Sequence, residues 1–164
     1  MKLVVKNGFL QNQDQKYKCS IGYNGLNKNK NEGDGCTPIG TFKINKILYR
    51  PDKINIHRFN IESEVIEKKH GWCDDINSDS YNQKIEFPFE QSAEHLHRND
   101  DLYDIICVID YNLNPIVKGK GSAIFLHVVR DDYSPTQGCI AIKKDELLQI
   151  AHNLIEDSTI LIED

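Results

Sequence analysis

The sequence predicts a mainly β fold, built as one domain over residues 1–164. Short apolar runs of alternating polarity recur along the chain, separated by Gly, Asn and Pro residues that favour turns. One stretch, residues 143–155, instead repeats its apolar side chains at helical spacing. A chain of 164 residues, of which 39% are hydrophobic, is long enough to enclose a core without disulfide or metal support.

The expected strands follow one another between turns. Residues 2–6 alternate as a strand, and Asn7-Gly8 is a strong signal for a hairpin back into residues 9–11. Further strands are expected at residues 17–21, 41–48, 103–109 and 158–162, and on both sides of residues 130–138. The apolar face of the helix would carry Leu147, Ile150, Ala151 and Leu154.

Two segments show no regular pattern. Residues 24–35 are polar and glycine-rich, which is typical of a solvated connection between strands. Residues 49–102 have weak periodicity, and we expect loops and short strands there, with one helical turn near residues 92–97.

Charge and hydropathy argue against several kinds of partner. The net charge is −5 and no tail is strongly basic, so neither nucleic acid nor an anionic membrane surface is an expected partner. No apolar run approaches the ~18 residues of a membrane-spanning helix. The start of the chain is too short and too quickly polar for a signal peptide, which leaves three alternatives open: a leader that has been removed, export by another route and a cytoplasmic location.

The cysteines do not form a disulfide pattern. There are five of them without paired spacing, so at least one thiol is free. Cys19 and Cys107 lie in alternating apolar runs and are expected in the core. Cys139 differs, because it opens an apolar run just after a polar loop that follows His127.

His127 and Cys139 are candidates for a base and its nucleophile. If two neighbouring strands are joined by a loop in which the chain reverses, the end of one strand at His127 lies beside the start of the other at Cys139. An imidazole converts a weak thiol, with a reference pKa of about 8.5, into a reactive thiolate. Gly138 lets the backbone turn, and the N–H groups of Gly138 and Cys139 could face a developing oxyanion. The alternative is a buried structural thiol.

These residues resemble the signature of the L,D-transpeptidase catalytic domain, the YkuD-like family. In that family a histidine precedes a Ser/Thr-x-Gly-Cys element, which here is Thr136-Gln137-Gly138-Cys139. An upstream block also resembles the family: Ile21-Gly22, then Thr-Pro-Ile-Gly-Thr-Phe at residues 37–42. The resemblance implies a β-sandwich with one helix after the catalytic cysteine and an irregular middle insertion.

The resemblance also implies the reaction. Cys139 would attack the amide carbonyl at the L-centre of the diamino acid in position three of a peptidoglycan stem peptide, expel the terminal D-alanine and form a thioester. An amine acceptor would make the enzyme an L,D-transpeptidase, and water would make it an L,D-carboxypeptidase. No cofactor is needed, and the periplasm or cell envelope is the implied location. A backbone carbonyl, that of Val128 or a neighbour, would orient His127, with Asp131 and Asp132 as alternatives.

The signature departs from the family at two positions that bear on substrate binding. Thr136 and Gln137 are expected to contact substrate, although the family commonly has histidine at position 137. It also commonly has arginine at position 141, which here is alanine. A guanidinium is the natural partner of a D-alanine carboxylate, and Arg130 is the candidate that compensates.

The middle segment contains a further resemblance. Gly-Trp-Cys-Asp-Asp at residues 71–75 resembles an insertion that covers the active-site cleft in a sub-branch of the family. Trp72 and Asp74 are therefore expected to line the cleft. The alternative is that Trp72 fills the core while Asp74 or Asp75 caps a turn.

Two other functions fit parts of the sequence. One is a zinc site, although no second half-site with firm spacing is present and no metal is expected. Its ligands would be His70 and Cys73 with Cys36, His127 or Cys139, and His95 and His97 form a further pair. The other is a catalytically silent peptidoglycan-binding module, favoured by the departures at Gln137 and Ala141.

Overall fold

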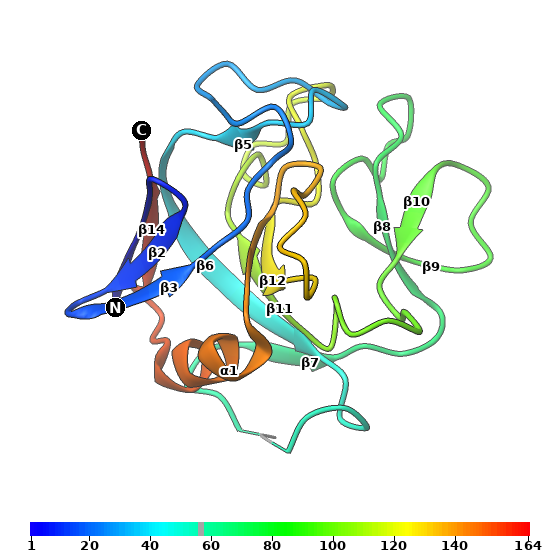
Figure 1. Cartoon of the computed structure of the whole chain (residues 1–164). Helices are drawn as coiled ribbons and strands as arrows, with labels where there is room; N and C mark the ends of the chain where they lie inside the picture. Colours follow the sequence, from blue (N-terminus) through cyan, green and yellow to red (C-terminus); the bar gives the residue numbers. More distant parts are fainter. Residues whose placement is uncertain (56–57) are drawn as a thin grey trace.

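The structure of the chain is a computed structural model that describes residues 1–55 and 58–164 (Figure 1). Strands dominate it, and the mainly β prediction is confirmed. The strands of the described residues are β1 (Lys2–Lys6), β2 (Phe9–Asn12), β3 (Gln15–Lys18), β4 (Leu26–Asn27), β5 (Thr37–Pro38), β6 (Gly40–Tyr49), β7 (Ser63–Val65), β8 (His70–Cys73), β9 (Lys84–Glu86), β10 (Ala93–His95), β11 (Ile105–Ile109), β12 (Phe125–Val128), β13 (Ile140–Ile142) and β14 (Thr159–Ile162). The helix is α1 (Lys144–Asn153).

The long strand β6 joins two halves of a nine-stranded sheet. The strand order is β13-β12-β11-β6-β14-β1-β2-β3, and β7 also pairs with β6. Residues 40–43 of β6 pair with β14, whereas residues 44–49 pair with β11. The last strand, β14, lies inside the sheet and runs parallel to the first, β1, so the two ends of the chain hold each other in place.

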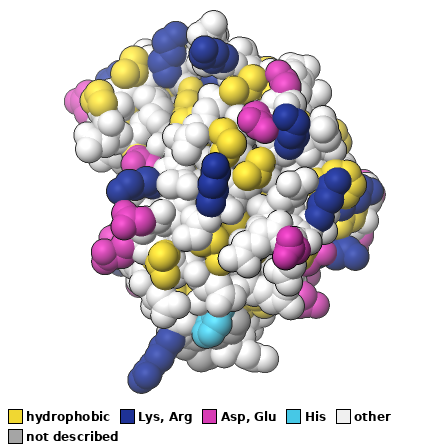
Figure 2. Space-filling view, turned by 90° about the vertical axis from the view of Figure 1, so that its left-hand side faces the viewer, with side chains coloured by type: hydrophobic (Ala, Val, Ile, Leu, Met, Phe, Trp, Pro, Cys, Tyr) yellow, Lys and Arg dark blue, Asp and Glu magenta, His cyan; other side chains and the backbone are white. Residues whose placement is uncertain are grey.

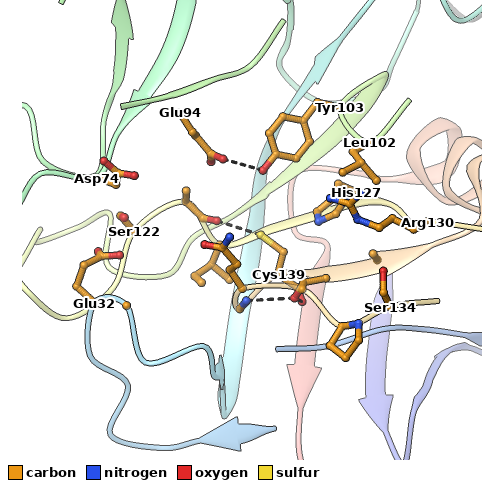
Figure 3. A pocket seen from close by; sticks show the side chains of 18 of the residues that line it. Glu32, Asp74, Glu94, Leu102, Tyr103, Ser122, His127, Arg130, Ser134 and Cys139 are labelled. Carbon is orange, nitrogen blue, oxygen red and sulfur yellow. Dashed lines mark hydrogen bonds between the residues drawn. The ribbon is translucent and has the colours of Figure 1, made fainter. Parts of the chain in front are cut away.

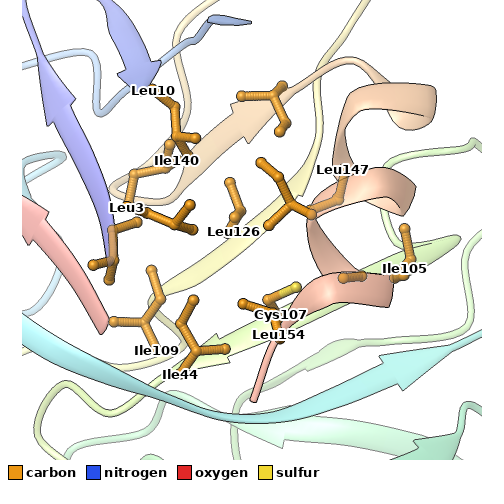
Figure 4. Packing of buried hydrophobic residues seen from close by; sticks show 14 of the residues in the cluster. Leu3, Leu10, Ile44, Ile105, Cys107, Ile109, Leu126, Ile140, Leu147 and Leu154 are labelled. Atoms are coloured by element: carbon orange, nitrogen blue, oxygen red, sulfur yellow. The ribbon is translucent and has the colours of Figure 1, made fainter. Parts of the chain in front are cut away.

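The two halves of the sheet enclose the main hydrophobic core, which α1 covers on one side (Figure 4). Alternate residues of β1 and β14 are buried in it, as the period of a strand requires. The apolar face expected for the helix is confirmed, since its buried residues are Leu147, Ile150 and Ala151, followed by Leu154 at the helix end. Burial of each such leucine or isoleucine contributes about 1.5–3 kcal/mol to folding.

The middle segment packs as a small sheet against the other face of β11 and β12. Its strand order is β10-β8-β9. Trp72 of β8 meets Phe125 of β12 edge to face, with ring centroids 5.1 Å apart, in a second buried cluster. The helical turn expected near residues 92–97 is wrong. Ala93–His95 is a strand because its backbone pairs with β8, a partner that local sequence does not reveal.

The pairing of β12 with β13 differs from the expected reversal. The strands are neighbours, but they run parallel, with Leu126 opposite Ile140. Residues 129–139 therefore carry the chain back to the start of β12 instead of closing a hairpin. The strand expected at residues 17–21 also ends early, at Lys18, and Ser20 instead exchanges two backbone hydrogen bonds of 2.9 Å with Ala141 of β13.

Figure 2 shows the side of the molecule on which β1, β2, β3 and β14 lie. Basic and acidic side chains are interspersed over this face, which gives it no strong potential of one sign. Among the described residues, no helix has the length and apolar character needed to cross a membrane.

Candidate active site

A cavity of about 330 Å³ opens between the main sheet and the small sheet, and both His127 and Cys139 line it (Figure 3). His127 lies in β12, and Cys139 immediately precedes β13. In the parallel register His127 is opposite Ala141. Cys139 is two residues before Ala141, so its side chain lies on the same face as that of His127. The two candidate residues are therefore brought together by parallel strands.

The thiol of Cys139 is held by backbone groups on β12 and the loop before it. Its Sγ donates to the carbonyl oxygen of Ala123 at 3.1 Å and accepts from the N–H of Phe125 at 3.4 Å. Burial, together with the negative charge of Glu94, raises the pKa of Cys139 to about 12. The resting cysteine is therefore a neutral thiol at physiological pH.

The imidazole of His127 is oriented by the carbonyl expected from the sequence. Its Nδ1 lies 2.8 Å from the backbone oxygen of Val128. A carbonyl accepts a proton but has none to give, so Nδ1 carries the hydrogen and Nε2 keeps its lone pair. Burial lowers the pKa of His127 to about 4, which keeps the ring neutral. The alternative partner Asp132 instead accepts the N–H of Ser134 at 2.9 Å, in a turn.

Thr136 organises the turn that presents the cysteine. Its hydroxyl donates to the carbonyl oxygen of Cys139 at 2.6 Å and accepts the N–H of Gly138 at 3.1 Å. The expectation that the Gly138 N–H faces an oxyanion is therefore corrected, because that donor is already engaged. Gly138 itself is needed for the turn: its φ is +143°, and a Cβ there would lie 2.9 Å from the carbonyl oxygen of Cys36.

The upstream motif lies directly beneath this turn. The hydroxyl of Thr37 accepts the N–H of Gly22 at 2.9 Å and lies 3.4 Å from the carbonyl oxygen of Cys139. Gly22 in turn forms a bridge with Thr136, and a Cβ on Gly22 would overlap the carbonyl of Gly35. Two sequence blocks that are far apart along the chain thus meet at the nucleophile.

The structure places four of the five predicted substrate-binding residues on the cavity: Asp74, Arg130, Thr136 and Gln137. Trp72 is the exception, and the alternative interpretation of it as a core residue is correct. Its side chain is 5% exposed, and its Nε1 donates to Asn82 Oδ1 at 2.9 Å. An indole can satisfy its N–H inside the protein while its ring fills the core, which is what Trp72 does here.

Sequence reasoning missed several residues that line the cavity. Residues 24–35, expected to be a solvated connection, contribute Lys30 and Glu32, and the Lys30 side chain is 4% exposed. Glu94 of β10 and Tyr103 also face the cavity, and the Tyr103 hydroxyl donates to Glu94 Oε2 at 3.0 Å. No local pattern could have identified these residues, since they come from separate segments.

Asn82 links the small sheet to the backbone that holds the thiol. Its side chain is 1% exposed, and its Oδ1 accepts from Trp72 Nε1 at 2.9 Å and from the N–H of Ala123 at 3.0 Å. Its Nδ2 donates to the carbonyl oxygen of Asn112 at 2.7 Å. Ala123, whose carbonyl accepts the Cys139 thiol, has a φ of +52°, a strained conformation for alanine that Asn82 helps to hold.

The candidate zinc ligands are not brought together. In the described part of the chain, no group of three or more His, Cys, Asp or Glu side chains has an arrangement that could hold a metal ion. The His70 Nδ1 accepts the N–H of Glu67 at 3.1 Å, and His95 stacks on Phe87 with centroids 3.9 Å apart. All five cysteines are free, and the four other than Cys139 are buried.

Comparison with known proteins agrees with this geometry. The sequence model of the YkuD family, the L,D-transpeptidase catalytic domain, matches residues 2–162 of the 164-residue chain. A search of curated proteins gave no significant match. The family match spans both sequence blocks that meet at Cys139 and every strand of the fold. The chain belongs to the L,D-transpeptidase catalytic domain family.

Proposed function

We propose that the protein is an L,D-transpeptidase that acts on peptidoglycan stem peptides, with Cys139 as nucleophile and His127 as general base. The observation that carries this proposal is the arrangement of the two side chains. They lie on one face of a parallel strand pair and line one cavity, and the Val128 carbonyl leaves the lone pair of the His127 Nε2 available.

The reaction would proceed in two acyl transfers. Nε2 of His127 takes the thiol proton while Sγ of Cys139 bonds to the carbonyl carbon at the L-centre of the diamino acid in position three. The C–N bond to D-alanine breaks, the imidazolium returns the proton to the leaving amine, and a thioester remains. An acceptor amine then attacks the thioester, and the thiol regains a proton as the new amide forms.

The resting charges of the pair set the order of events. The pKa of Cys139 is raised to about 12 and that of His127 is lowered to about 4, so a neutral thiol faces a neutral imidazole. Proton transfer therefore accompanies attack, as in a serine hydrolase, instead of preceding it. The N–H of Cys139 is the proposed oxyanion donor, a contact that contributes about 3 kcal/mol to transition-state stabilisation.

The proposal places the leaving D-alanine on the side of the nucleophile where His127 lies. Arg130 lines the cavity on the same side of Cys139 as His127 (Figure 3). In the proposed enzyme its guanidinium pairs with the carboxylate of the leaving D-alanine, and Gln137 contacts the peptide next to the turn. Because peptidoglycan lies outside the cytoplasmic membrane, the proposed place of action is the cell envelope.

Mass spectrometry of the intact protein tests the proposal. Incubation with a stem tetrapeptide or a carbapenem should give one adduct, at Cys139, which Cys139→Ala abolishes and Cys36→Ala retains. His127→Gln should slow its formation by about a hundredfold or more. The products are then identified by mass after a tetrapeptide donor is mixed with an acceptor. Crosslinked dimers support a transpeptidase, and tripeptide alone indicates an L,D-carboxypeptidase. If no compound labels Cys139 in preference to the other four cysteines, the silent binding module is favoured.

A further inference from the structure

Lys30 carries a buried positive charge beside the turn that presents the nucleophile. Its side chain is 4% exposed, and among the described residues it is the one buried lysine. It belongs to the loop between β4 and β5 and lines the cavity that contains Cys139. Its Nζ atom would lie 3.4 Å from a Cβ added to Gly138, the residue just before the nucleophile. The ammonium is therefore next to the atoms that react in the proposed enzyme.

Two glycines leave the space that the end of this side chain occupies. A Cβ on Gly121 would lie 2.8 Å from Cε of Lys30 and 3.2 Å from its Cδ. Gly121 and Gly138 have φ values of +105° and +143°, which glycine adopts far more readily than other residues. Gly138 precedes the thiol, and Gly121 is two residues before Ala123, whose carbonyl accepts the thiol. The backbone on both sides of Cys139 thus confines the ammonium.

Asp34 holds the ammonium but does not use all of its hydrogen atoms. Nζ of Lys30 donates to Asp34 Oδ1 at 2.7 Å and, more weakly, to the carbonyl oxygen of Asn31 at 3.4 Å. An ammonium has three N–H groups, so one of them has no acceptor within the described residues. A buried charge with an unpaired donor costs free energy, which an oxygen atom of a bound ligand would recover.

The Lys30–Asp34 ion pair is not needed to close the loop. The same Asp34 carboxylate accepts the N–H of Asn31 and the N–H of Cys36, each at 2.9 Å. These two bonds join the ends of the loop without the lysine. A buried ion pair also adds little net stability, because both charges lose their hydration. The bond to Asp34 therefore serves mainly to orient the ammonium.

The turn before Cys139 offers fewer oxyanion donors than acyl transfer uses. Such enzymes usually direct several donors at the oxygen that becomes negative. The N–H of Gly138 is already bonded to the Thr136 hydroxyl at 3.1 Å, which leaves the N–H of Cys139 as the backbone donor of this turn. Lys30 lies beside it and favours negative charge there. Burial raises the pKa of Cys139 to about 12, and the charge of Lys30 acts in the opposite direction.

We propose that Lys30 is a catalytic residue, the second donor to the oxygen atom that becomes negatively charged when Cys139 attacks a carbonyl group. The inference rests on acyl transfer by Cys139 in the proposed function and adds a residue to it. As Sγ bonds to the carbonyl carbon, the π electrons of the C=O bond move onto oxygen. The N–H of Cys139 and the ammonium of Lys30 donate to that oxygen until the bond to the leaving group breaks and the C=O bond forms again. Lys30 keeps its proton throughout, and His127 remains the base.

The test compares two reactions of Cys139, of which one forms an oxyanion. p-Nitrophenyl acetate acetylates the thiol through a tetrahedral oxyanion, whereas iodoacetamide alkylates it by displacement of iodide at a saturated carbon. Intact-mass kinetics measure both rates, and Cys139→Ala gives the labelling of other cysteines to be subtracted. Lys30→Met removes the charge and the donors from a side chain of similar shape. We expect it to slow acetylation by about a hundredfold and alkylation by less than about fivefold.

The ratio of the two effects decides between roles for Lys30. If acetylation falls by at least about tenfold more than alkylation, Lys30 acts on the oxyanion. A smaller difference overturns the inference, because a lysine that only holds the turn or only favours the thiolate affects both reactions alike. Lys6→Met is the matched control, since it removes an exposed lysine that pairs with Glu163, and it should change neither rate.

A second measurement uses the unchanged protein, in case Lys30→Met does not fold. A peptide aldehyde adds the Cys139 thiol across its C=O bond, and the oxygen of the resulting hemithioacetal marks the position of the oxyanion. A crystal structure of this adduct should place Nζ of Lys30 within about 3.2 Å of that oxygen. A longer distance overturns the inference.

Stem peptides separate this inference from the proposed function. If no stem tetrapeptide or carbapenem acylates Cys139, but Lys30→Met selectively loses acetylation, the proposed function fails and the role of Lys30 in acyl transfer stands. If stem peptides acylate Cys139, but Lys30→Met slows acetylation and alkylation alike, the role of Lys30 fails and the proposed function stands.

Discussion

The Nδ1 atom of His127 lies 2.8 Å from the carbonyl oxygen of Val128, the next residue of the same strand. Because this hydrogen bond is made to the backbone of the same strand, the orientation of the ring does not depend on a third side chain. Burial lowers the pKa of the imidazole to about 4 and outweighs the hydrogen bond to the uncharged carbonyl, which acts in the opposite direction. The base is thus neutral, and ready to accept a proton, across a wide pH range.

The low pKa of His127 predicts how stability depends on pH. The unfolded chain binds a proton at this residue near the ordinary pKa of 6.5, whereas the folded protein binds it only near 4. The free energy of unfolding should therefore fall as pH is lowered from 6.5 towards 4, by up to about 3 kcal/mol from this residue. Urea unfolding at pH 7, 5.5 and 4.5 measures it. His127→Gln should show a shallower fall, and identical slopes in both proteins would contradict the prediction.

The hydroxyl of Thr136 should matter more than its methyl group. Thr136→Val removes the acceptor for the Gly138 N–H and the donor to the Cys139 carbonyl. Looser presentation of the thiol should slow formation of the Cys139 adduct by about tenfold. Thr136→Ser keeps the hydroxyl and should retain most of the rate. The two rates are compared by stopped-flow mass analysis, and equal losses in both variants would contradict the greater importance of the hydroxyl.

Gly138→Ala should be damaging because two effects combine. The backbone has a φ of +143°, and the added Cβ would lie 2.9 Å from the carbonyl oxygen of Cys36. We expect a loss of about 2–3 kcal/mol in unfolding free energy and a strong loss of Cys139 labelling. Gly25→Ala is the matched control, since its φ is +76° but no atom lies within 4 Å of the added Cβ. It should cost about 1 kcal/mol and leave labelling intact.

Asn82→Ala should weaken both stability and reactivity. It leaves the buried Trp72 Nε1 and the Ala123 N–H without their acceptor. The expected loss is about 2–4 kcal/mol of unfolding free energy, with slower alkylation of Cys139 because Ala123 holds its thiol. Asn153→Ala, which removes an exposed bond of 2.8 Å to Gln149 at the end of α1, should change neither quantity appreciably. Thermal unfolding and iodoacetamide kinetics on the three proteins decide the matter.

By itself, the sequence determined the features that depend only on residues close together in the chain. Three predictions of this kind are confirmed: the alternation of β1, the Asn7-Gly8 turn and the apolar helix face around Leu147. Each depends on side chains only a few residues apart. The signature at Thr136 to Cys139 and the block at residues 37–42 identified the family for the same reason: each is a short run of fixed spacing. Such runs specify a turn that presents one side chain, whatever the rest of the chain does.

Only the tertiary structure decided how those pieces meet. β13 runs parallel to β12 and pairs with Ser20 along its other edge, and no pattern near Cys139 encodes either contact. Trp72 lies in the core because its ring packs against Phe125 and its Nε1 donates to the side chain of Asn82. Glu94 faces the cavity because its strand pairs with β8. The free energy of these choices comes from packing and hydrogen bonding between residues far apart in the chain.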